Sequence, residues 1–193
     1  MELIGKNITY KYPSSKKYVL KDVDKIIIES NNNTRTGLVF DGDVHVKSNI
    51  ELTGTPNGEG KADARIEIND GKSVQIDQIT STAAKGLVQV NGTGSVKLGN
   101  IDAQQGRMVL QTNGNETQKG SYELQNIHVG ENASFEMCVY DDNSHVNPPA
   151  EITGQIQAYL DKGAKIDFGG MHAKDWKPDK INVAADSLTV HIA

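Results

Sequence analysis

The chain has 193 residues and a formal net charge of −5, and its composition is 36% hydrophobic but only 5% aromatic. The apolar content is too high for a disordered chain, whereas the scarcity of aromatic residues argues against a conventional sandwich core. The negative charge, without a Lys/Arg-rich patch, excludes nucleic acid and anionic membrane surfaces as expected partners, and no apolar run approaches the roughly 20 residues of a membrane-spanning helix.

The first residues, 1–6, lack the charged and apolar regions of a signal peptide. We therefore expect a piece of a longer secreted chain rather than a cytoplasmic protein. Strands are predicted at 7–12 and 25–29, around a turn at 13–16. Because a stack of coils needs a covered end, residues 1–24 are a candidate N-terminal cap, and residues 25–193 are expected to form stacked coils within a single domain of 1–193.

An internal repeat is the most informative pattern. Segments 73–79, 95–101 and 121–127 align without gaps, with Ser first, an aliphatic residue fourth and Ile last, and they start 22 and 26 residues apart. This spacing is close to one coil of a parallel β-helix, in which like side chains stack. A shorter copy at 44–50 ends in the Asn-Ile pair also found at 100–101 and 126–127, and 187–192 keeps the alternation.

A second strand precedes each copy, at 65–68, 86–90 and 107–110. Period-two alternation predicts two inward columns from these strands: Ile66, Val88 and Met108 in one, and Ile68, Val90 and Leu110 in the next. The positions between them face outward: Glu67, Gln89 and Val109, of which Val109 is the only apolar one. At most one short helix is expected, over 155–162.

The turns between paired strands leave two architectures open. They contain Asn91-Gly92, Asn113-Gly114 and Asn69-Asp70-Gly71, and Asn-Gly between alternating strands is also a strong hairpin signal. An antiparallel β-sandwich or meander is therefore the alternative. The similarity of copies one coil length apart favours an all-β, right-handed parallel β-helix, a solenoid.

Few residues suggest chemistry. Asp41, Asp43 and His45 alternate and could share one face of a strand, as a cation site or an acid/base pair would require. Asp41-Gly42-Asp43 is also an ordinary turn, and we favour the turn, so no metal and no cofactor are predicted. The single cysteine, Cys138, cannot form an internal disulfide and is expected to face inward.

Two predicted loops hold the candidate ligand contacts. Asp141, Asp142 and His145 weakly resemble the paired aspartates of polysaccharide hydrolases, but the Gly-His-Gly and Arg-x-Lys of that family are missing, so a solvated loop is favoured.

The second loop contains His172, Asp175 and the only tryptophan, Trp176. A lone indole beside charged residues could stack on a sugar ring or anchor a protein partner, although it more often covers an open end or flank of the core. These two groups of three residues are the predicted contact residues of the chain.

The sequence pattern of residues 86–96, short alternating strands joined by Asn-Gly turns, resembles that of the passenger domains of Gram-negative autotransporter adhesins. This resemblance spans about residues 30–193. The resemblance implies export to the cell surface and a non-catalytic role in adhesion or aggregation. The implied partners are a host or bacterial surface protein, a glycan, or a second copy. The alternative is a carbohydrate-active β-helix, namely a polysaccharide lyase, a hydrolase or a phage tail-fibre domain.

Overall fold

The structure is a computed structural model. It describes residues 2–4, 9–12, 18–20, 25–30, 35–55, 63–114, 117–140, 150–167, 181–183 and 188–192.

Two parallel sheets make up the described chain. The larger one, sheet A, contains β1 (Glu2–Ile4), β3 (Tyr18–Leu20), β4 (Lys25–Glu29), β6 (Val44–Thr53), β8 (Ser73–Ser81), β10 (Ser95–Ala103), β12 (Gly120–Val129), β14 (Ala150–Thr153), β15 (Ile156–Leu160), β17 (Ile181–Val183) and β18 (Leu188–Ile192). The smaller one, sheet B, contains β2 (Thr9–Tyr12), β5 (Arg35–Phe40), β7 (Asp63–Ile68), β9 (Lys85–Asn91), β11 (Arg107–Asn113), β13 (Ser134–Tyr140) and β16 (Lys165–Asp167).

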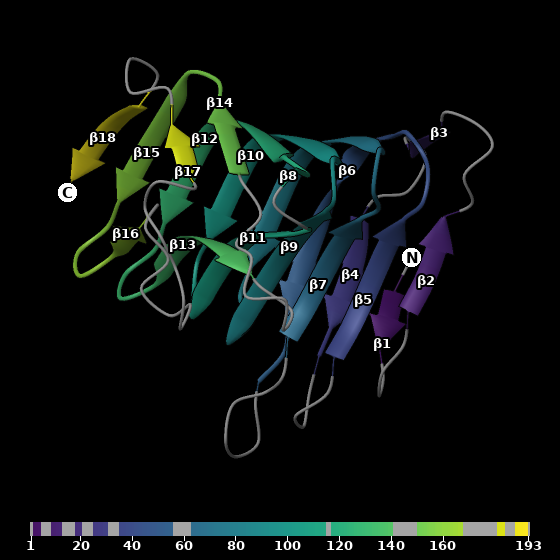
Figure 1. Ribbon diagram of the computed structural model, residues 1–193. Helices are drawn as coiled ribbons and strands as arrows, with labels where there is room; N and C mark the ends of the chain where they lie inside the picture. The colour runs from purple at the N-terminus through teal and green to yellow at the C-terminus, as the bar shows by residue number, and fades with distance from the viewer. Residues whose placement is uncertain are drawn as a thin grey trace.

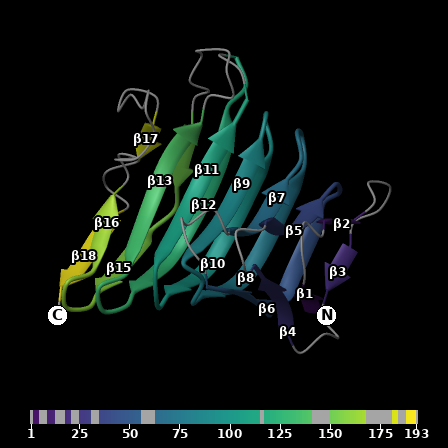
Figure 2. The same cartoon turned by 90° about the horizontal axis from the view of Figure 1, so that it is seen from below.

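The chain alternates between the two sheets and advances along one axis. In Figure 1, β2 and β5 of sheet B, in front, point up, β15 and β18 of sheet A, behind, point down, and the chain runs from right to left. This winding is right-handed, as parallel crossovers are. The view from below shows the sheets as two layers (Figure 2). The fold is therefore the predicted right-handed parallel β-helix.

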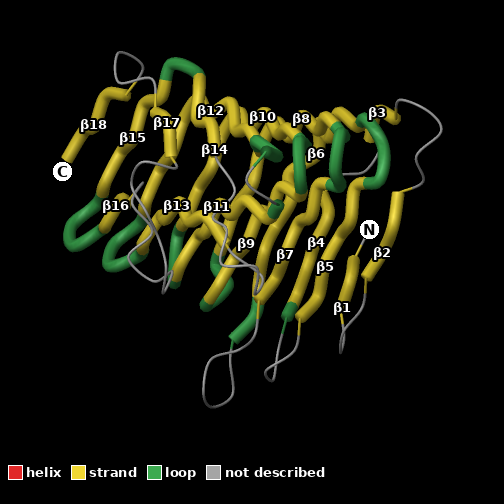
Figure 3. Tube along the Cα trace, viewed as in Figure 1, coloured by secondary structure: helices red, strands yellow, loops and turns green. Residues whose placement is uncertain are grey.

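The described elements are strands and their connections, without a helix (Figure 3). No described helix is long and apolar enough to cross a membrane. The short helix expected over 155–162 is wrong, because Ile156–Leu160 forms β15. Ile156, Ala158 and Leu160 are buried and alternate with exposed or half-buried residues, and this period of two belongs to a strand.

Similar side chains lie opposite one another on neighbouring strands of sheet A. Leu98 of β10 lies opposite Ile76 of β8 and Leu124 of β12 in parallel ladders, and all three are fully buried. This register confirms the alignment of the three sequence copies. It also excludes the antiparallel alternative, since every paired strand of the described chain runs parallel to its neighbour.

The long strands of sheet A bend near their middle. In β8, Val74 and Ile76 are buried, but two non-buried residues, Asp77 and Gln78, follow before burial resumes at Ile79. β10 has the same interruption at Gly99 and Asn100. The bend divides the outer surface of sheet A into a first half, before the corner, and a second half, after it.

The predicted columns of sheet B are correct between β7 and β9 but wrong for β11, which is shifted by two residues. Val88 does lie opposite Ile66, but its partner on β11 is Leu110, and Thr112 lies opposite Val90. The turns set this register, because Asn91 and Asn113 lie opposite each other at the ends of their strands.

Met108, which we had aligned with Val88, instead lies opposite Gly86. A Cβ at Gly86 would come within 3.2 Å of the Met108 sulfur. Glycine therefore leaves room for the long methionine side chain in a core that is packed to crystal-like density.

The first strands continue the sheets. β1, β2 and β3 pair in parallel with β4, β5 and β6, respectively. An end-capping role for residues 1–24 stays a prediction.

Candidate functional site

The contact residues predicted from sequence lie outside the described residues: Asp141, Asp142, His145, His172, Asp175 and Trp176. The side chain of Cys138 does so as well. Candidate sites must therefore come from the described sheets.

Asp41, Asp43 and His45, which the sequence offered as a less favoured cation site or acid/base pair, do not converge on one another. Each binds the next coil instead: Asp41 accepts a hydrogen bond from Asn69 Nδ2 at 2.9 Å and Asp43 accepts one from Ser73 N at 2.9 Å. His45 Nε2 lies 2.7 Å from Asp77 Oδ1. Neighbouring coils are about 4.8 Å apart, closer than residues i and i+2 of one strand, so contacts form along the stack. The described residues contain no group of three or more His, Cys, Asp or Glu arranged to hold a metal ion.

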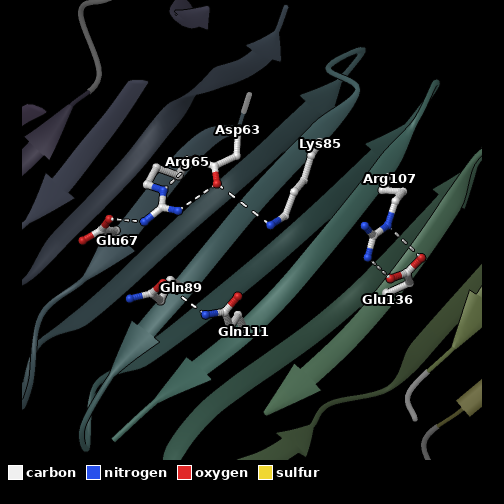
Figure 4. A network of polar contacts seen from close by, with 8 residues as sticks. All are labelled: Asp63, Arg65, Glu67, Lys85, Gln89, Arg107, Gln111 and Glu136. Carbon is white, nitrogen blue, oxygen red and sulfur yellow. Dashed lines mark hydrogen bonds and ion pairs between the residues drawn. The ribbon is translucent and has the colours of Figure 1, made fainter. Parts of the chain in front are cut away.

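The outer face of sheet B carries a network of paired charges (Figure 4). Arg65 Nη2 and Nη1 bind Asp63 at 2.8 Å and Glu67 at 3.0 Å. Burial acts to lower the pKa of Arg65, but the hydrogen bonds and charges of the two carboxylates outweigh it and raise that pKa. On β11, Arg107 Nη2 binds Glu136 at 2.7 Å. These guanidinium groups are therefore engaged by carboxylates.

Part of this outer face is also buried. Leu87 and Val109 face outward, beside Arg65 and Glu136 in the register, yet they are only 1% and 2% exposed. Neither belongs to the core cluster between the sheets. The outward orientation predicted for Val109 is correct, but the side chain is buried. The open surface of the described stack must be sought on sheet A.

The second half of sheet A presents a continuous row of outward side chains, which we call the outer column. Its members lie directly opposite one another on six successive strands: Glu51, Thr80, Asp102, His128, Tyr159 and His191. Glu51, Thr80, Asp102 and His128 each follow the isoleucine that ends a sequence repeat. That fixed offset was the signal in the sequence that could have located the column.

His128 joins three coils. Its Nδ1 lies 2.7 Å from Asp102 Oδ1 on the preceding coil, and its Nε2 lies 3.1 Å from Asp161 Oδ2 on the following one. The hydrogen bond to Asp102 is the main cause of a raised His128 pKa; partial burial opposes the shift, and the bond and charge of Asp161 reinforce it. The two carboxylates therefore favour the imidazolium form of His128 over the neutral form.

The column ends in two stacked rings. The rings of Tyr159 and His191 have centroids 4.7 Å apart and planes inclined by 8°. Tyr159 is 45% exposed, and His191 Nε2 lies 3.0 Å from Gln157 Oε1. Because the rings stack along the solenoid axis, polar ring edges face the solvent.

A groove of about 410 Å³ lies beside the other end of the column, over β8. The described residues that line it are all polar: Glu51, Thr53, Gln78, Thr80, Thr82, Asp102 and Gln104. Lys25 binds Glu51 at 3.2 Å, and Gln104 donates to Asp102 at 2.8 Å. The sequence repeat did not predict this groove, because its walls come from three coils.

The corner of sheet A carries a second polar row, of amide side chains. The register aligns Asn49, Gln78, Asn100, Asn126 and Gln157. Asn126 Nδ2 donates to Asn100 Oδ1 at 2.9 Å. The recurring Asn-Ile pair of the sequence therefore marks an amide ladder on the outside and an isoleucine column inside.

The comparisons with known proteins add no family to this description. No protein-family model, no curated protein and no solved structure matches the chain.

Proposed function

We propose that the chain is a non-catalytic adhesion or aggregation module of a cell-surface or secreted protein. It resembles coils of a Gram-negative autotransporter passenger, and this resemblance implies export, with no cofactor. The partner would be a surface protein, a glycan or a second copy. A stack of coils is a stiff scaffold, and function on such a scaffold is carried by the exposed faces.

The outer column is the observation that carries the proposal. Its six positions span five coil spacings, or about 24 Å, on an uninterrupted parallel sheet. Three polar side chains without rings, Glu51, Thr80 and Asp102, are followed along it by three rings, of His128, Tyr159 and His191. A long, open and polar surface suits contact with an extended partner better than it suits the enclosure of a small substrate.

The charges of the described chain favour binding over catalysis. The backbone N–H and hydroxyl of Thr93 lower the pKa of Asp70. Partial burial acts to raise the pKa of Asp77, but hydrogen bonds from His45 and Gln75 outweigh it and lower that pKa. A general acid at neutral pH needs the opposite shift.

A carbohydrate-active enzyme is the second candidate, and one observation favours it. Glu51 and Asp102 line the same groove from strands two coils apart, a backbone separation of about 9.6 Å. This backbone separation is close to the roughly 6.5–9.5 Å that separates the two carboxyl groups of inverting glycosidases. Against it, Lys25 pairs with Glu51 and His128 pairs with Asp102.

Attachment assays test the proposal. Beads coated with the 193-residue chain are expected to adhere to bacterial or host cells, or to clump, more than albumin-coated beads do. The double variant Tyr159→Ala/His191→Ala should weaken this attachment. The double variant Lys97→Ala/Glu123→Ala, which removes an ion pair on the first half of sheet A, is the matched control and should not.

Two results would contradict the proposal. One is bead attachment and clumping no greater than with albumin. The other is release of reducing ends or unsaturated sugars from polysaccharides incubated with the chain, which would establish the enzyme instead.

A further inference from the structure

We propose that the groove over β8 is a binding site for a neutral sugar unit of a glycan. The inference rests on the proposed function, because it takes the open second half of sheet A as the binding surface. It names the class of ligand that this surface would recognise.

The shape of the groove follows from side-chain length. Thr80 is short, and its neighbours in the outer column, Glu51 and Asp102, are longer, so they form walls on the two sides along the axis. Gln78 at the corner and Thr82 beyond the strand line the groove as well. The volume of about 410 Å³ is within the range of small-ligand pockets.

Several side chains that line the groove can form hydrogen bonds but form none with other described residues. The side chains of Thr53, Gln78 and Thr82 have no hydrogen-bond partner among the described residues. Hydroxyls both donate and accept, and the amide of Gln78 offers two donors and an acceptor. Sugar hydroxyl groups, which also donate and accept at closely spaced positions, can satisfy such a set.

The charges select against anionic ligands. Glu51 and Asp102 are acidic walls, and the nearby Lys25 is held by Glu51 at 3.2 Å. A uronate, sulfate or phosphate group would meet these carboxylates, and the described lining residues include no Lys or Arg to balance it. The favoured ligand is therefore uncharged.

Other ligand classes fit less well. A divalent cation needs oxygen ligands within about 2.6 Å of it, whereas Glu51 and Asp102 come from strands two coils apart. Among the described residues, none that lines the groove is apolar, as a lipid would require. A peptide could not add as a strand here, because β8 is already paired on both sides, with β6 and β10.

Binding of defined sugars to the 193-residue chain tests the inference. The probes are linear tetrasaccharides of glucose, mannose, galactose and N-acetylglucosamine, with oligoglucuronate and a sulfated oligosaccharide as anionic comparisons. Chemical-shift changes in NMR spectra of the labelled chain report both affinity and location. We expect at least one neutral probe to shift the resonances of Thr80 and Thr82, and the anionic probes to bind more weakly.

Two variants and a control locate the contact. Thr82→Val keeps the side-chain volume, removes one hydroxyl and should weaken binding about 2- to 10-fold. Thr80→Tyr fills the groove and should abolish binding. Thr153→Val, an exposed threonine on the first half of sheet A, is the matched control and should bind as the parent does. Unchanged circular dichroism spectra confirm that each variant is folded.

The outcomes separate this inference from the proposed function. Tighter binding of anionic probes, or undiminished binding by a folded Thr80→Tyr chain, would overturn the neutral-sugar site. If no neutral probe binds while coated beads still attach to cells, the site is rejected and the adhesion module is retained. Loss of bead attachment with sugar binding intact would reject the adhesion module and retain the site.

Discussion

Tyr122 offers the sharpest test of how the two sheets are joined. It lies on β12 in sheet A and is fully buried, and its hydroxyl reaches across the core to sheet B. There it accepts a hydrogen bond from Gln111 N at 3.1 Å and lies 2.9 Å from Val88 O and 2.6 Å from Gln111 O. A single hydroxyl hydrogen can serve only one of these two carbonyls at a time.

Tyr122→Phe should destabilise the protein by about 1–3 kcal/mol, because backbone groups of Val88 and Gln111 lose a hydrogen-bond partner in the buried core. For a chain of this length, that corresponds to a decrease in Tm of about 2–12 °C. Tyr159→Phe is the matched control: its ring is 45% exposed, so the same loss of a hydroxyl should change stability by less than about 0.5 kcal/mol.

Urea unfolding followed by circular dichroism measures the difference between the two variants. Because a solenoid can unfold in parts, hydrogen exchange at the Gln111 amide should be read as well, and it should become faster in Tyr122→Phe. Equal stability of both variants, with unchanged exchange at Gln111, would refute the role of Tyr122 as a link between the sheets.

Three further predictions concern a buried hydroxyl, a histidine with a raised pKa and a strained glycine. Thr112 is 1% exposed and its hydroxyl has no partner, so Thr112→Val should stabilise by about 1 kcal/mol in urea unfolding; destabilisation would count against this. The pKa of His128 is raised in the folded state, so its ion pairs contribute stability that is fully present below the unfolded-state pKa and is lost as pH rises through the folded-state pKa. The free energy of unfolding, measured from pH 5 to 8, should therefore show this decrease in the parent chain and not in His128→Gln. Gly154 has φ +108° and a Cβ there would collide with the Leu124 carbonyl oxygen, so Gly154→Ala should lower Tm more than Gly71→Ala, which has φ +67° and no atom within 4 Å.

The repeat predicted sheet A well because its information is local. Ser73, Ser95 and Ser121 begin equivalent segments in the sequence and lie opposite one another in the structure. Alternation within each segment identified the inward side chains, and recurrence one coil later identified their neighbours. Both signals can be read within a few tens of residues.

Sheet B was harder to align because its strands differ in composition. Matching the apolar residues paired Met108 with Val88, but the structure places Met108 opposite Gly86. The glycine and the methionine fill one layer together, a complementarity of volume that a search for similar residues cannot detect. The Asn-Gly turns were the better guide to this register.

The chain's own pattern favoured a solenoid of parallel strands over an antiparallel sandwich, because a recurrence near the length of one coil lets similar side chains stack on one another. The pattern could not determine which outer face stays open. Outward residues of sheet B such as Leu87 and Val109 are buried, whereas those around Thr80 border a groove. Exposure depends on what every other coil places nearby, so only the tertiary structure could locate the surface proposed to bind a partner.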